Sequence, residues 1–226
     1  MNKSLYLKVA VQLLLFPIVM GALLFLPAGT LDYWEAWVFV AVFFACSAAI
    51  GIWLMIKDPK LLERRMNVGP AAEKETTQKI IVVFALLSFA GSGILPALDH
   101  RFGWSDVPTS VVILGDILIA LSYLAFYSVF RENTYGAANI QVEENQRVIS
   151  TGPYALVRHP MYTGALVLTL GIPLALGSWW GLLLFIPGVA GIMWRLLDEE
   201  RFLSENLVGY TEYKSKVRYR LVPFVW

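Results

Sequence analysis

The sequence is poor in the residues that make disulfides, metal sites and hydrated surfaces. Its 226 residues include one cysteine, Cys46, and two histidines, and charged side chains account for 15% of the chain. One cysteine excludes an internal disulfide and argues against a thiolate-bound metal, so we predict no metal site. A net charge of +1 without a basic domain argues against a nucleic-acid partner.

Long apolar runs are abundant instead. Hydrophobic residues make up 58% of the chain, above the share in an average soluble domain. Four stretches, 5–27, 34–56, 80–98 and 107–130, each approach the ~20 residues with which a helix crosses a bilayer core. A fifth, 161–194, has 34 residues without Asp, Glu, Lys, Arg or His, enough for two helices. We therefore predict an all-α, polytopic integral membrane protein with about six transmembrane helices.

The fifth region is expected to be a short helical hairpin. Gly177, Ser178 and Gly181, together with Trp179 and Trp180, are typical of a turn at a membrane interface. Each arm then has about 15 residues, roughly 22 Å at helical rise, against a hydrocarbon core of ~30 Å. The charged residues that flank the hairpin should therefore lie close to lipid.

Positive charge favours one side of the predicted membrane protein. Under a six-helix arrangement, 17 of the 18 Lys and Arg residues fall on one side, and only Arg101 lies opposite. Because cytoplasmic loops hold the positive excess, both termini are predicted to be cytoplasmic. We divide the chain into a four-helix transmembrane scaffold, residues 1–130, and residues 131–226, which form a connector, the hairpin and a cytoplasmic C-terminal tail. Asp116 is the one acid deep within a span, and we expect a hydrogen bond between helices to satisfy it.

A first group of polar residues precedes the hairpin. Tyr154, Arg158 and Tyr162 recur at intervals of four and share one face if a helix continues through Pro160. With His159, they bring two phenols, a guanidinium and an imidazole to the mouth of a membrane hairpin. Arginine and tyrosine are also ordinary anchors at a membrane border, so this group has a purely structural alternative.

A second group follows the hairpin. Arg195 and Glu199 are four residues apart, as are Arg201 and Glu205, which is the spacing of self-paired, solvated helix ends. Against that alternative, the short hairpin places Arg195 and Glu199 near lipid depth, where charges need partners or a water-filled cavity. The tail beyond them is predicted to fold back over the hairpin mouth.

The motifs of the last third occur in a characteristic order. They run Gly152-Pro153-Tyr154, Val157-Arg158-His159-Pro160-Met161-Tyr162-x-Gly164, the hairpin, Glu199-Glu200-x-x-Leu203, Gly209-Tyr210-x-Glu212-Tyr213 and Arg218-x-Arg220-Leu221-x-Pro223. This pattern resembles the isoprenylcysteine carboxyl methyltransferase family, and segments 58–62 and 98–104 look like its bacterial members. The resemblance implies a membrane-embedded S-adenosylmethionine site built from the connector, the hairpin and the tail. It also leads us to expect a multi-pass protein of the cell inner membrane.

The resemblance implies roles for particular residues. The expected catalytic residues are Arg158, Glu199 and Arg195. The residues expected to bind the cofactor are Gln146, Gly152, Pro153, Tyr154, His159, Pro160, Tyr162, Glu200, Tyr210 and Tyr213. Tyrosine faces can contact a cationic sulfonium, glutamates can bind ribose hydroxyls or the amino group, and arginine can bind a carboxylate. Gln146 stands where many relatives have histidine and, unlike histidine, cannot become cationic.

The predicted acceptor is a lipophilic or small membrane-partitioning molecule, or a lipidated one, that presents a carboxylate or a thiol and enters from the bilayer. A carboxylate needs no base, whereas a thiol needs one, and His159 is either that base or a cofactor contact. Two other functions compete. A membrane NADPH-dependent reductase of the sterol-reductase type shares an Arg-His-Pro-x-Tyr-x-Gly stretch, but the Glu199-Glu200 pair favours the methyltransferase. A non-enzymatic small transporter or assembly factor would be expected to show repeats and polar groups near the bilayer midplane.

Overall fold

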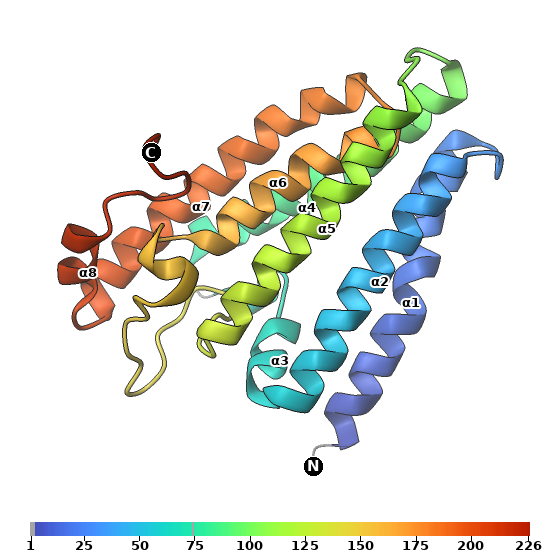
Figure 1. Ribbon diagram of the computed structural model, residues 1–226. Helices are drawn as coiled ribbons and strands as arrows, with labels where there is room; N and C mark the ends of the chain where they lie inside the picture. Colours follow the sequence, from blue (N-terminus) through green and yellow to red (C-terminus); the bar gives the residue numbers. More distant parts are fainter. Residues whose placement is uncertain (1–2, 74) are drawn as a thin grey trace.

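The structure, a computed structural model, describes residues 3–73 and 75–226, and this part of the chain is helical with no strand. The long helices are α1 (Lys3–Ala28), α2 (Trp34–Lys57), α4 (Thr76–Phe102), α5 (Thr109–Glu132), α6 (Pro160–Ala175) and α7 (Phe185–Asn206). The short elements are α3 (Pro59–Met66), α8 (Tyr210–Lys216) and the 3₁₀ turns η1 (Pro70–Ala72), η2 (Gly152–Ala155) and η3 (Trp180–Leu184). The long helices run along one common direction, with α3, α8 and the connector gathered at one end of the bundle (Figure 1).

Five stretches are long and apolar enough to cross a membrane: Leu7–Ala28, Trp34–Lys57, Thr76–Phe102, Thr109–Glu132 and Trp180–Asn206. These confirm the four predicted scaffold spans and the polytopic membrane fold. The sixth predicted span is α6, which has 16 residues and is about 24 Å long at helical rise. The expectation of two short hairpin arms is therefore right for the first arm. It is wrong for the second, because α7 continues as helix for 22 residues through Arg195 and Glu199.

The hairpin packs against α5 through glycines. A Cβ atom on Gly115 would lie 2.2 Å from the backbone nitrogen of Ala175, and one on Gly171 would lie 3.1 Å from the carbonyl oxygen of Gly115. Near the other end of α6, a Cβ on Gly164 would lie 2.8 Å from the Phe126 ring. Small residues let membrane helices approach closely, and these three glycines fix α6 against α5. In Figure 1, α6 lies between α5 and α7.

The far end of the bundle, where the hairpin turns, is held by a buried carboxylate. Asp99 in α4 is 1% exposed and accepts hydrogen bonds from Ser178 in the hairpin turn and from Ser105 Oγ, the latter at 2.6 Å. The Tyr33 hydroxyl donates to the Leu176 carbonyl at 2.6 Å. Neutral donors from the hairpin turn, the α4–α5 loop and the α1–α2 loop thus hold the turn in place.

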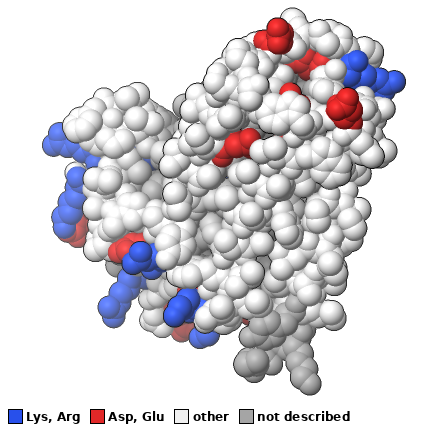
Figure 2. Space-filling model, turned by 45° about the vertical axis from the view of Figure 1, so that its right-hand side comes forward, with Lys and Arg blue, Asp and Glu red and all other residues white. Residues whose placement is uncertain are grey.

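Charge separates along the bundle as the sequence predicts. Arg101 is the basic residue of the far end, where it lies among acids, while other Lys and Arg side chains gather toward the opposite end (Figure 2). We call that opposite end, which carries α3, the connector and α8, the site end. Lys74 lies outside the described residues, as does the side chain of Lys3. The surface between the two charged ends carries few charged side chains in Figure 2, and it is the face expected to contact lipid.

Asp116 corrects one expectation. Its residue is buried in α5, yet its Oδ1 atom has no hydrogen-bond partner within the described part of the chain. The predicted hydrogen bond between helices is therefore not observed for this oxygen.

Candidate active site

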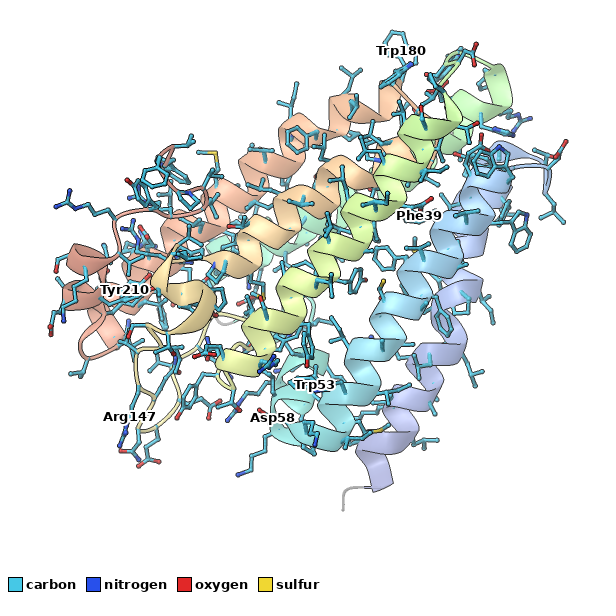
Figure 3. All side chains as sticks on the ribbon, viewed as in Figure 1. Phe39, Trp53, Asp58, Arg147, Trp180 and Tyr210 are labelled. Carbon is cyan, nitrogen blue, oxygen red and sulfur yellow. The ribbon has the colours of Figure 1, made fainter. Side chains whose placement is uncertain are left out.

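The polar motifs of the last third meet at the site end. The connector between α5 and η2 has no regular structure, and it lies against the starts of α6 and α8 and the end of α7. Figure 3 shows Arg147 of the connector and Tyr210 of α8 at this end, with Trp180 of the hairpin turn at the other. The hairpin therefore separates its polar mouth from its turn by the full length of α6.

Proline sets the geometry of the hairpin mouth. Pro160 is the first residue of α6, a position where its missing N–H and fixed φ angle favour helix initiation. Tyr154 lies in η2, outside that helix. Tyr154, Arg158 and Tyr162 therefore do not share one face of a continuous helix; a turn brings them together instead.

Glu200 is the centre of the polar network. It is 4% exposed, and its Oε1 atom lies 2.6 Å from Arg158 Nε and 3.2 Å from His159 Nε2. Its Oε2 atom accepts from Arg220 Nε at 2.9 Å. Three basic side chains, two from the hairpin mouth and one from the tail, thus share one buried carboxylate. We call this group the Glu200 cluster.

The tail folds back over the hairpin mouth, as predicted. The backbone nitrogens of Arg158 and His159 donate to the carbonyl oxygens of Tyr219 and Arg220 at 2.9 and 3.0 Å. Arg158 Nη1 adds hydrogen bonds to the carbonyl oxygens of Val217 and Arg218 at 3.0 and 3.1 Å. The tail is therefore a wall of the site, fixed by backbone and side-chain bonds together.

A narrow cavity of about 100 Å³ lies between these elements. Eight of the residues predicted to form the site line it: Gln146, Tyr154, Arg158, His159, Pro160, Tyr162, Glu199 and Tyr210. Connector residues, among them Asn133 and Asn139, form the opposite wall. Residues that are far apart in the sequence thus form one polar cavity at the mouth of the hairpin.

Phenol groups dominate the chemistry of the cavity wall. The Tyr162 hydroxyl donates to Glu199 Oε2 at 2.5 Å, and the Tyr154 hydroxyl accepts from Asn133 Nδ2 at 2.9 Å. The Tyr210 hydroxyl lies 3.5 Å from His159 Nε2. Burial raises the pKa of Tyr154 to about 12, and burial also raises the pKa of Tyr210. These phenols stay neutral near pH 7, so they act as hydrogen-bond donors and aromatic faces rather than as bases.

Four predicted site residues lie beside the cavity rather than on its wall. Gly152 and Pro153 form η2, where Gly152 has a φ of +56° that favours glycine. Glu200 lies behind the cavity wall in its cluster. The Tyr213 hydroxyl donates to the Tyr154 carbonyl at 2.8 Å, so α8 supports the turn that presents Tyr154.

Arg195 has a different environment from the one expected. The self-paired alternative with Glu199 is wrong, because Arg195 Nη2 contacts Glu73 Oε1 and the Ala138 carbonyl, both at 2.8 Å. Its Nη1 atom donates to Gln78 Oε1 at 2.9 Å. Arg195 thereby ties α7 to α4 and to the connector. With Tyr162 it lines a second, apolar cavity of about 170 Å³ between α4, α6 and α7.

Sequence reasoning missed several residues of the site. Arg220 belongs to the tail motif, but its pairing with Glu200 depends on how the tail folds. Glu73 and Gln78 belong to a loop and a helix start that look like an ordinary basic border. Asn133 and Asn139 had a usable signal, since uncharged amides in a connector next to a membrane site are candidate ligand contacts.

The sequence is similar to those of known methyltransferases. Residues 110–208 match the family model described as phospholipid methyltransferase. A probable protein-S-isoprenylcysteine O-methyltransferase of Oryza sativa subsp. indica is 28% identical over 169 residues, which cover 71% of this chain and 84% of the relative. Protein-S-isoprenylcysteine O-methyltransferase A of Arabidopsis thaliana is 29% identical over 153 residues, or 65% of this chain and 73% of the relative. These relatives are plant proteins, whereas the sequence motifs suggested bacterial ones.

Proposed function

We propose that this protein, a membrane methyltransferase of the isoprenylcysteine carboxyl methyltransferase-like family, transfers a methyl group from S-adenosylmethionine to the carboxylate of a lipophilic acceptor. The observation that carries the proposal is the polar cavity at the mouth of an apolar hairpin, where Glu199, neutral phenols and the Glu200 cluster meet. The names of the plant relatives specify a prenylated cysteine, and this supports a carboxyl acceptor attached to a lipid-like chain.

The chemistry of the cavity wall fits this methyl donor. Asn139 lines the cavity, and its buried Oδ1 atom lacks a hydrogen-bond partner among the described residues. Such an atom is an acceptor for an N–H or O–H group of a ligand. Glu199, which lines the same cavity, can accept hydrogen bonds from ribose hydroxyls or an amino group. The phenol faces of Tyr154 and Tyr210 suit a positively charged ligand.

S-adenosylmethionine supplies an electrophilic methyl group on a sulfonium sulfur. The chain's own residues bind and orient the two reactants and exclude water from the site. Arg158 uses Nε and Nη1 for the Glu200 cluster and the tail, which leaves Nη2 to hold the carboxylate of the cofactor. Tyr162 orients Glu199 through its hydroxyl. Arg195 acts as a positioning residue, because it fixes α7 against the connector.

A carboxylate acceptor explains why no free base is needed. A carboxylate is already ionised at neutral pH, so catalysis reduces to alignment of two reactants in a site shielded from water. His159 lies 3.2 Å from the Glu200 carboxylate and therefore belongs to the framework of the site. The matched family and the named relatives are methyltransferases, which favours this function over the reductase and the transporter.

Location and orientation form part of the proposal. The concentration of Lys and Arg at the site end supports a cytoplasmic position for the site and for both termini. Cell inner membrane is the expected location. The acceptor would reach the site from the bilayer, because apolar cavities lie between the helices on either side of the hairpin mouth.

Calorimetry on the detergent-purified protein tests the cofactor. We expect S-adenosylmethionine to bind and reduced nicotinamide dinucleotide not to bind. Glu199→Gln should weaken binding of S-adenosylmethionine about tenfold or more, since it replaces a charged acceptor. Glu205→Gln, an exposed position on the same helix and outside the cavity, is the matched control. Binding of the dinucleotide alone would replace the methyltransferase with a reductase.

Methyl transfer is tested separately. An N-acetyl-S-prenylcysteine is offered with S-adenosylmethionine labelled in its methyl group, and we expect a base-labile methyl ester to form. The corresponding amide, which lacks the carboxylate, should accept no label. Label on the amide, or no label on either compound while the cofactor binds, would contradict the carboxylate acceptor.

A further inference from the structure

An apolar cavity of about 330 Å³ lies between α1, α2 and α5, in the half of the bundle nearest the site. This volume is within the ~300–1,000 Å³ usual for small-molecule sites. Its wall consists mainly of aliphatic and aromatic residues: Val9, Leu13, Phe16, Phe44, Ile50, Leu54, Leu62, Met66, Tyr123, Phe126 and Phe130. Arg65, from the last turn of α3, is the charged residue among the described residues that line it. A lone cation at the edge of an apolar cavity calls for a matching ligand.

The Arg65 side chain reaches from this cavity to the site. Its Cζ atom lies 5.1 Å from the centre of the Phe130 ring, on the wall of the apolar cavity. Its Nη1 atom donates to the Ala137 carbonyl at 3.2 Å and lies 3.5 Å from Met161 Sδ. Ala137 and Met161 line the polar cavity at the hairpin mouth. Arg65 is thus the side chain that lies between the two cavities.

Arg65 has no carboxylate partner within residues 3–73 and 75–226, although its guanidinium has five N–H donors. Its neighbour Arg64 differs, because Arg64 Nε pairs with Glu143 Oε1 at 3.0 Å. Burial lowers the pKa of Arg65, and the groups that face it are the Tyr162 and Tyr154 phenols and the Arg195 guanidinium. None of these groups supplies a negative charge at neutral pH.

We propose that Arg65 is a specificity-determining residue, which binds the carboxylate of the acceptor while the acceptor's apolar chain occupies the α1–α2–α5 cavity. The inference rests on the proposed function and adds to it a residue from outside the C-terminal third. The ligand it selects is an amphiphile with one carboxylate and one flexible apolar chain. A guanidinium fork matches a carboxylate in geometry and charge, and it rejects an alcohol of the same length.

The position of Arg65 suits the transfer step. A carboxylate oxygen forms the new bond to the methyl carbon while the bond from that carbon to sulfur breaks. The sulfur keeps the electron pair and becomes a neutral thioether, the acceptor becomes a methyl ester, and no proton moves. Arg65 holds the carboxylate at the boundary where the apolar cavity meets the polar one, which contains Tyr154 and Tyr162.

The test measures binding of two probes, dodecanoic acid and dodecanol, to the full chain in lipid nanodiscs without a methyl donor. We expect the wild type to bind the acid at least about tenfold more tightly than the alcohol. Arg65→Gln should bring the ratio close to one, and Arg65→Lys should restore part of it, because lysine keeps the charge but loses the fork. An unchanged ratio in Arg65→Gln would overturn the proposal.

Two further variants separate recognition from structure. Arg64→Gln is the matched control, because Arg64 also bonds a connector carbonyl, that of Thr134 at 3.0 Å, but does not line the apolar cavity. It should keep the full preference for the acid. An equal loss of that preference in Arg64→Gln would show that Arg65 only holds the connector in place. Gly51 lines the cavity, and a Cβ there meets no atom within 4 Å. Gly51→Leu should fill the cavity and weaken binding of both probes equally. This variant tests the cavity even if Arg65→Gln does not fold.

The outcome is distinguishable from failure of the proposed function. Binding of S-adenosylmethionine with no role of Arg65 in selecting the acid would remove this inference and leave the methyltransferase intact. Selection of the acid by Arg65 without any binding of S-adenosylmethionine would leave a fatty-acid site and remove the methyltransferase.

Discussion

Two buried carboxylates hold the two ends of the hairpin in opposite ways. At the site end, Glu200 balances Arg158, His159 and Arg220. At the far end, Asp99 accepts from two serine hydroxyls. The charged cluster joins three segments and depends on every partner. Asp99 joins the hairpin turn to the α4–α5 loop through donors that carry no charge. Loss of the Asp99 carboxylate therefore leaves no other ion unpaired.

The contrast shows which substitutions should destabilise each end of the fold. Removal of one partner from a buried ion cluster leaves uncompensated charge, whereas removal of one hydroxyl acceptor leaves an unpaired dipole. The far end is also supported by direct backbone packing at Gly115. Stability there should depend on shape, and stability at the site end should depend on charge.

Glu200→Gln should have the largest effect. The buried Arg158 guanidinium and the partly exposed Arg220 guanidinium lose their counter-charge, and we expect a loss of about 3–5 kcal/mol in the free energy of unfolding. Denaturant titration of the detergent-solubilised protein measures it, and binding of S-adenosylmethionine should weaken in parallel. A loss below that of Asp99→Asn would show that the site end does not depend on charge.

Gly115→Ala should rank second. Its Cβ atom would lie 2.2 Å from a backbone atom that cannot rotate away, so α5 and α6 must separate at a cost of about 1–3 kcal/mol. Gly51→Ala is the matched control, because a Cβ there meets open space and the helix gains propensity. Thermal unfolding followed by circular dichroism compares the two variants, and equal midpoints would exclude close packing as the support of the far end.

Asp99→Asn should cost less, about 1–2 kcal/mol. Both serine hydroxyls donate to Oδ2, a position that the amide oxygen can take, so both hydrogen bonds remain but lose the strength that the charge of their acceptor gives them. The same thermal measurement applies. Binding of S-adenosylmethionine should be unchanged, because the turn lies at the opposite end of α6. Weaker binding would show that the two ends of the hairpin are coupled.

Tyr213→Phe should have the smallest effect. It removes one neutral hydrogen bond to the Tyr154 carbonyl, about 0.5–1.5 kcal/mol. We expect a modest rise in the Kd of S-adenosylmethionine, since η2 positions Tyr154 on the cavity wall. Calorimetry measures the change, and Tyr219→Phe serves as the comparison because no hydrogen bond of its hydroxyl is observed in the described chain.

Much of the fold could be predicted from the sequence because lipid imposes a simple rule. Runs of about 20 apolar residues became helices, and the Gly177–Gly181 segment became the turn. The length of α7 could not be predicted, because it depends on partners for Arg195 that come from a loop more than a hundred residues earlier.

The candidate site was predictable to a similar degree. Local motifs identified the hairpin mouth and the tail, and most of these residues line one cavity. Arg65 and Glu73 could not be identified, because their roles arise from contacts between the second loop and the connector. Spacing within a segment reports one helix face, and it carries no information on which loop covers that face.

The backbone bonds between residues 158–159 and 219–220 also set the order of assembly. The Arg158 segment leaves the ribosome about 60 residues before its tail partners, a delay of roughly 3–12 s at usual elongation rates. During that interval the uncharged hairpin can insert while its mouth remains open. Arg158 then lies at the membrane without the tail segment that later covers it. The candidate site is therefore closed only after the helices have entered the membrane, so we expect a product that ends before residue 219 to be anchored but inactive.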